Sequence, residues 1–190
     1  MRKVVFIVFS TLAIAVVFGC NTNSSAGAVS SETATVIYSS DESISSDALK
    51  PYQAVEDFMC GDGYNILVVS FQDELDYLVE DIKAGNVDVI SAELSECESA
   101  GESVPELYKI NGDPESCSLV CAWARTLATY EASYLSSCID AATAMKHGDE
   151  SLAIDILEES QSDLEKVTED IQGLVDAYEK MMAEYSELRK

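Results

Sequence analysis

Cysteine is the residue type in this sequence with the clearest capacity for chemistry. The chain has 190 residues and six cysteines. Five of the six lie beyond the N-terminal region, at Cys60, Cys97, Cys117, Cys121 and Cys138. Outside the cytoplasm such thiols usually pair as disulfides, and an odd number leaves one thiol over. The cysteine pattern therefore favours a protein stabilised by disulfides.

Helical geometry predicts which cysteines meet. Since an α-helix turns by about 100° per residue, Cys117, Cys121 and Cys138 share one face of a helix. In an antiparallel array, four cysteines gather at one end of the bundle: Cys60, Cys97, Cys117 and Cys121. Cys138 lies about 32 Å away along its helix. We therefore expect two disulfides that join Cys60 and Cys97 to the pair in the third helix, with the pairing open, and a buried free thiol at Cys138.

The same four thiols allow an alternative, a tetrahedral zinc site with four thiolate ligands. Their spacing lacks the short Cys-x2-Cys pairs typical of such sites, and an exported location favours oxidation. Disulfides are therefore the preferred interpretation, and we expect no cofactor and no metal.

Other catalytic arrangements are not supported by the residues present. His147 is the only histidine, which excludes zinc sites that need a histidine pair. No phosphate-binding glycine loop and no nucleophile elbow occurs. Carboxylates are so numerous that neighbours such as Glu158 and Glu159 indicate only a solvated face. An acidic segment offers weak calcium ligands without the alternation of an EF-hand, at Glu96, Glu98, Glu102 and Glu106. The sequence predicts that the protein is not an enzyme.

The elements that must position these residues are helices. Apolar residues recur at steps of three and four along the first long helix, at Ile66, Leu67, Phe71, Leu75, Leu78 and Ile82. This helix ends at Gly85-Asn86, and a second begins at about Val87. Residues 99–113 carry glycines, Pro105 and an Asn-Gly turn, and they predict a loop. The sequence leaves open whether residues 47–59 form a separate helix.

Two further helices follow. Pro114 opens a third, with Asp113 as its cap, and this helix runs to about Lys146. His147-Gly148 ends it, and Asp149 can cap the last helix. Heptad-spaced apolar residues follow in that helix: Leu157, Leu164, Val167, Ile171, Leu174, Tyr178, Met181, Tyr185 and Leu188. The pattern spans roughly 50 Å, and its wide apolar stripe favours a bundle within one chain over a coiled coil between chains.

The N-terminus has the layout of an export signal. Arg2 and Lys3 precede an apolar run over residues 4–18, which is short for a membrane span. Its end resembles the lipobox of prokaryotic lipoproteins, with Val17, Phe18, Gly19 and Cys20 in the four box positions. The resemblance implies that residues 1–19 are removed and that Cys20 carries a lipid. The alternative is an uncleaved anchor helix.

The composition of the chain limits the classes of ligand that it can bind. The formal net charge is -24 and the isoelectric point is about 4.1, an acidity that resembles exported archaeal proteins. Nucleic acid and anionic lipid both need clusters of Lys and Arg, so neither is an expected ligand. Residues 20–47 are rich in Ser and Thr and predict a flexible stalk.

The sequence thus predicts an all-α fold, an antiparallel bundle of three to four helices over residues 48–190 that is stapled by disulfides. We expect a lipid-anchored protein on the outer side of the cell membrane. Its expected role is non-enzymatic, as a module that binds a protein partner or itself and assembles in the envelope. The alternative is a domain that binds a small ligand or a metal ion, in the bundle interior or beside tyrosines such as Tyr134.

Overall fold

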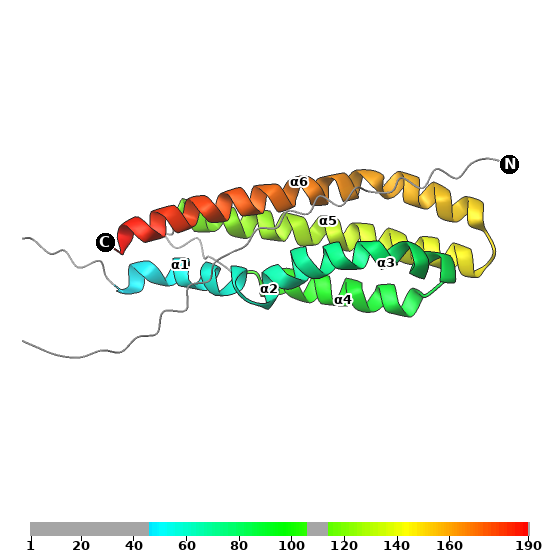
Figure 1. Cartoon of the computed structure of the whole chain (residues 1–190), viewed down its shortest axis with the longest axis horizontal. Helices are drawn as coiled ribbons and strands as arrows, with labels where there is room; N and C mark the ends of the chain where they lie inside the picture. Colours follow the sequence, from blue (N-terminus) through cyan, green and yellow to red (C-terminus); the bar gives the residue numbers. More distant parts are fainter. Residues whose placement is uncertain (1–45, 106–113, 190) are drawn as a thin grey trace, which may run out of the picture. The chain divides into compact units, whose positions relative to one another are not determined.

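The computed structural model describes residues 46–105 and 114–189. The chain divides into two units, Met1–Ile37 and Tyr38–Lys190, and all described residues belong to the second. These residues form helices and no strand (Figure 1), so the predicted all-α class is confirmed for them. The helices are α1 (Ser46–Met59), α2 (Asp62–Tyr64), the π-helix η1 (Asn65–Ser70), α3 (Phe71–Ala84), α4 (Val87–Ser103), α5 (Glu115–Lys146) and α6 (Glu150–Leu188).

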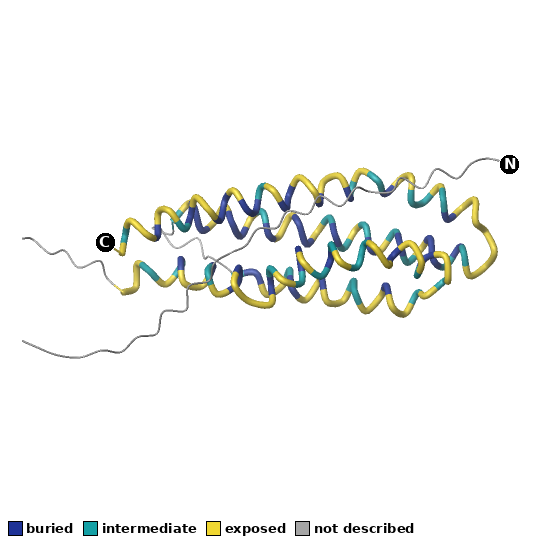
Figure 2. The backbone as a smooth tube through the Cα atoms, in the orientation of Figure 1, coloured by how far each residue is buried: buried dark blue, intermediate teal, exposed yellow. Residues whose placement is uncertain are grey.

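Helix α5 is the central element of this unit. The long helix α6 packs antiparallel to it along one side, and the hairpin of α3 and α4 packs on another side (Figure 1). Buried positions line the surfaces at which these helices meet, and exposed positions face outward (Figure 2). Most of the core is therefore built around α5.

The heptad stripe of α6 faces α5, as predicted for a bundle within one chain. Leu164, Ile171 and Leu174 are among its buried residues. Gly173 lets the helices approach closely, because a Cβ atom there would lie 2.7 Å from Cε2 of Trp123 in α5. The contact between α5 and α6 is thus a specific fit as well as an apolar one.

The predicted helix ends at the turns are confirmed. Gly85 follows α3 with φ 68°, a left-handed conformation that suits glycine. Asp149 caps α6, and its Oδ1 accepts a hydrogen bond of 3.1 Å from the Leu152 amide. Residues 85 and 146 lie side by side, since a Cβ at Gly85 would be 3.1 Å from the Lys146 Cβ. The α3–α4 turn and the α5–α6 turn therefore share one end of the bundle.

Helix α4 corrects one predicted boundary. Residues 99–113 were expected to form a loop, but α4 continues to Ser103. The cause is tertiary packing, because Gly101 lies so close to α5 that a Cβ there would be 2.9 Å from the Ala128 Cβ. The predicted cap Asp113 lies outside the described residues, and Pro114 directly precedes α5.

Helix α1 is a separate element that covers the other end of the bundle. Tyr52 stacks on Tyr185 of α6, with ring centroids 5.2 Å apart. The Tyr52 hydroxyl donates a hydrogen bond of 2.5 Å to Glu184 Oε1.

Within the described residues no helix has an apolar stretch long enough to span a bilayer.

Candidate functional site

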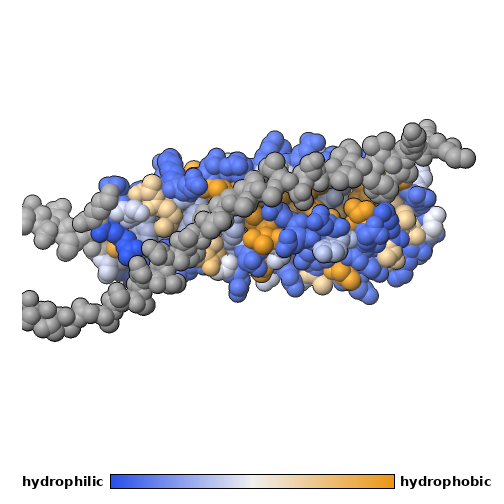
Figure 3. Space-filling view, viewed as in Figure 1, coloured by the Kyte–Doolittle hydropathy of each residue, from blue (hydrophilic) through white to orange (hydrophobic). Residues whose placement is uncertain are grey.

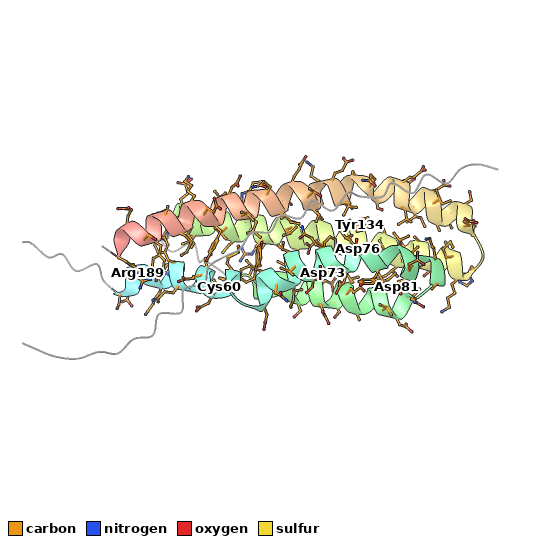
Figure 4. All side chains as sticks on the ribbon, viewed as in Figure 1. Cys60, Asp73, Asp76, Asp81, Tyr134 and Arg189 are labelled. Atoms are coloured by element: carbon orange, nitrogen blue, oxygen red, sulfur yellow. The ribbon has the colours of Figure 1, made fainter. Side chains whose placement is uncertain are left out.

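The structure corrects the expected disulfide staple. None of the five described cysteines forms a disulfide with another. Cys60 follows α1 (Figure 4), and its Sγ lies 3.7 Å from the Tyr178 hydroxyl of α6. Cys117 and Cys121 are buried in the first two turns of α5.

The position of Cys97 gives the physical reason. Its Sγ lies 3.5 Å from the Ala128 carbonyl oxygen and 3.4 Å from Glu131 Oε2. Ala128 is about 10 Å further along α5 than Cys121, the nearer of the two predicted partners, at 1.5 Å per residue. The register of α4 on α5 thus separates Cys97 from Cys117 and Cys121, its two predicted partners.

The other two predicted cysteines have different outcomes. Cys138 is a buried thiol in α5, and burial is the main cause that raises its pKa to about 12. The proposed lipid site Cys20 lies outside the described residues.

Four carboxylates and one thiol line a small cavity between η1, α3, α4 and α5. We call these five residues the carboxylate cluster: Glu74, Glu93, Glu96, Cys97 and Glu131. Ile66, Ser70, Phe71 and Leu135 complete the lining. The cavity has about 10 Å³ of space, at the lower limit of what one water molecule needs. None of the lining residues carries a basic side chain.

Glu131 is the most unusual member of the carboxylate cluster. It is 0% exposed, one turn from Leu127 and Leu135 on the buried face of α5. Its Oε2 accepts a hydrogen bond from the Cys97 thiol, and its Oε1 has no hydrogen-bond partner. Burial, and then the charge of Glu74, raise the pKa of Glu131 well above its usual range, although the bond from Cys97 opposes this. Its surroundings therefore disfavour the charged form of this carboxyl group.

Glu93 of α4 and Glu74 of α3 face the same cavity. Glu93 Oε2 is buried without a hydrogen-bond partner. Burial first, and then the charges of Glu74, Asp81 and Glu96, raise the pKa of Glu93 to about 7. The pKa of Glu74 is also raised, chiefly by burial. Three helices thus bring together three carboxyl groups, and burial disfavours the charged form of each.

The π-helix η1 forms one wall of the cavity through Ile66 and Ser70. A π-helix is rare and occurs frequently at functional sites, because its wider turn displaces the residues that follow. Glu74 lies one turn beyond η1 in α3. The irregular backbone therefore adjoins the unusual carboxyl groups.

The geometry restricts the chemistry of the carboxylate cluster. No three His, Cys, Asp or Glu side chains in the part of the chain described are placed to hold a metal ion together. Burial, followed by the charge of Glu131, also raises the pKa of the Cys97 thiol, so that it remains a protonated and weak nucleophile. What remains is a group of carboxyl side chains, without a basic partner in the cavity lining, whose charged forms burial disfavours.

Reasoning from sequence missed this cluster. Carboxylates were interpreted as a solvated face because they are so numerous. A signal was present, since Glu131 occupies a position in the apolar stripe of α5 between Leu127 and Leu135. Glu93 likewise lies three residues after the buried Ile90 and four before Cys97.

The tyrosines of α5 and α6, among them the candidate ligand-site residue Tyr134, lie outside the lining of this cavity. Tyr178 and Tyr185 are buried in α6. Tyr134 of α5 lies beside Cys138, and burial raises the pKa of its hydroxyl. None of them lines the cavity.

Comparison with known proteins adds no assignment. The chain matches no protein-family model, no curated protein and no solved structure.

Proposed function

We propose that this protein is a non-enzymatic binding module on the outer side of the cell membrane, anchored by a lipid on Cys20. Residues 20–47 would act as its stalk. The observation that supports this role is the separation of the two ends of the bundle. Helix α1 begins beside the end of α6, whereas both inter-helical turns lie at the opposite end (Figure 1). A chain anchored before α1 would be tethered at the end of the bundle opposite these turns.

The end formed by the two turns, which we call the tip, carries charges of both signs, because Asp149 and Glu150 are exposed beside Lys146. Lys146 and His147 are exposed there, and Asn86 lies in the adjoining turn. Most of the visible surface is hydrophilic with small apolar patches (Figure 3). Two exposed apolar side chains adjoin the tip, Val89 at 46% and Leu152 at 47% exposure. We propose that the tip binds a protein partner through Lys146 and these two exposed apolar side chains.

The first experiment tests the anchor. The protein is expressed in a prokaryotic host with a lipoprotein pathway, and the intact mass of the membrane-bound form is measured for wild type and Cys20→Ser. We expect a lipid-modified chain that begins at Cys20 in the wild type, and a variant that carries no lipid. Retention of residues 1–19 in the wild type would instead support an uncleaved anchor helix.

The second experiment tests the tip. A photo-crosslinking amino acid replaces Lys146 in one variant and the exposed Glu179, in α6 far from the tip, in a control. We expect an identified envelope protein, or a second copy of this chain, to be crosslinked from position 146 and not from 179. Equal crosslinking from both positions would contradict a partner site at the tip.

A further inference from the structure

The carboxylate cluster combines three features that together point to regulation by protons. Its members come from three helices, its cavity contains no basic side chain, and Glu131 is completely buried with one unpartnered oxygen. A buried polar oxygen without a partner is rare and needs an explanation. An ionised carboxylate in such a place is more costly still.

We propose that the carboxylate cluster is a proton-dependent switch that controls how the α3–α4 hairpin packs on α5. When Glu131 and Glu93 are protonated, the hairpin remains closed on α5. When they lose their protons, their charges are repelled by Glu74 and require water, and the hairpin opens. The switch belongs to the bundle alone and does not depend on where the protein is anchored.

The groups that face Glu131 and Glu93 provide no compensating charge. Helix α3 contributes Glu74, with Asp73 and Asp81 along the same helix (Figure 4). Helix α4 contributes Glu96, Glu98 and the Cys97 thiol. Helix α5 contributes the Cys138 thiol, on which the charge of Glu93 acts, and its neighbour Tyr134. Helix η1 contributes only Ile66 and Ser70, and neither α1 nor α6 contributes to the lining.

The electrostatics agree with this arrangement. The pKa of Glu93 is about 7, and that of Glu131 is raised well above its usual range. Glu93 therefore loses its proton as pH rises through neutrality, and its charge then lies in the cavity that Glu131 shares. An uncompensated charge at the α4–α5 contact weakens this contact first.

The structure indicates how the switch opens. Helix α4 lies against α5 through the close contact of Gly101 with Ala128 and through the Cys97 thiol. Opening of the hairpin therefore exposes Cys97, which is 4% exposed in the closed form. Cys117, which is 0% exposed, lies beside Tyr52 at the α1 end of the bundle and provides an internal reference.

The experiment measures the exposure of these two thiols as a function of pH. The full chain is alkylated briefly from about pH 5.5 to about pH 8.5 with a chelator present, and mass spectrometry follows each cysteine. The ratio of the Cys97 rate to the Cys117 rate removes the general effect of pH on thiols. The ionised fraction of a group that titrates near pH 7 rises about thirtyfold over this range. We therefore expect the ratio to rise by about tenfold or more.

Three variants decide the origin of the rise. Glu93→Gln and Glu131→Gln should each abolish the rise of the Cys97-to-Cys117 rate ratio with pH. The matched control Glu158→Gln, at an exposed site on α6, should show the same rise as the wild type. A constant ratio in the wild type, or an unchanged rise in Glu93→Gln, overturns the proposal. If Glu131→Gln does not fold, Glu93→Gln alone decides. A rise that requires added divalent cation also overturns it, in favour of a metal ion as the ligand.

Discussion

Replacing Glu93 by Gln should stabilise the protein at alkaline pH and leave it unchanged at acid pH. The environment of Glu93 raises its pKa from 4.5 to about 7, mainly through burial. One pKa unit corresponds to about 1.4 kcal/mol, so this shift would correspond to about 3 kcal/mol for a fully buried group. Glu93 is only half-buried, and screening by solvent reduces the expected effect to roughly 1–2 kcal/mol.

The pH range follows from the direction of the pKa shift. Glu93 is an acid whose pKa is higher in the folded state, so the folded chain binds more protons than the unfolded chain between about pH 4.5 and pH 7. Its ionisation in the fold therefore lowers the free energy of unfolding as pH rises through this range. Below about pH 4.5 the penalty is absent, and above about pH 7 it is complete. Glu93→Gln removes the penalty because its amide does not titrate.

Urea unfolding followed by helical circular dichroism at several pH values measures this effect. The free energies of unfolding of wild type and Glu93→Gln should agree near pH 4 and should differ by roughly 1–2 kcal/mol near pH 8. Glu158→Gln removes the same formal charge from an exposed site and controls for general repulsion in this acidic chain. Parallel curves for wild type and Glu93→Gln would refute the reasoning, as would an equal gain in the control.

Three other outcomes follow from the packing and the cysteines. Gly173→Ala should lower the free energy of unfolding by about 1 kcal/mol, because overpacking against Trp123 outweighs the better helix propensity of Ala. Unchanged stability in urea unfolding would mean that the indole moves aside freely. Asp149→Ala should cost about 1 kcal/mol by removing the cap on the Leu152 amide, measured as a lower urea midpoint. Alkylation under denaturing conditions without reductant should label all five described cysteines; fewer labels would reveal a disulfide.

Local signals in the sequence predicted the helices well. Gly85, Pro114 and Asp149 lie at helix ends because their backbone or capping preferences act within a few residues. The heptad stripe of α6 also predicted its buried face, since periodicity alone determines which side of a helix is apolar. These features depend on neighbours in the sequence, which a single chain displays directly.

The disulfide prediction failed because it depended on how far one helix slides along another. Cys97 contacts Glu131 and not the start of α5, and that register is determined by tertiary packing such as the fit of Gly101 on Ala128. The same contact extends α4 beyond its predicted end. No periodicity within α4 or α5 encodes this offset.

The carboxylate cluster was missed for a related reason. In a chain with 35 acidic residues, each one considered alone indicates a solvated surface. Only the position of Glu131 within an apolar stripe distinguishes it, and only the fold shows that Glu74 and Glu93 meet it in one cavity.

The position of Glu131 is costly for a scaffold whose only task is to be stable. A buried oxygen without a hydrogen-bond partner costs about 1–3 kcal/mol, and Leu127 and Leu135 show that apolar side chains fit this face of α5. Repulsion from Glu74 adds to the cost whenever that group ionises. The penalty increases with pH and acts at the contact between α4 and α5. A stable bundle with a hairpin that responds to protons accounts for this placement, whereas general stabilisation of the core does not.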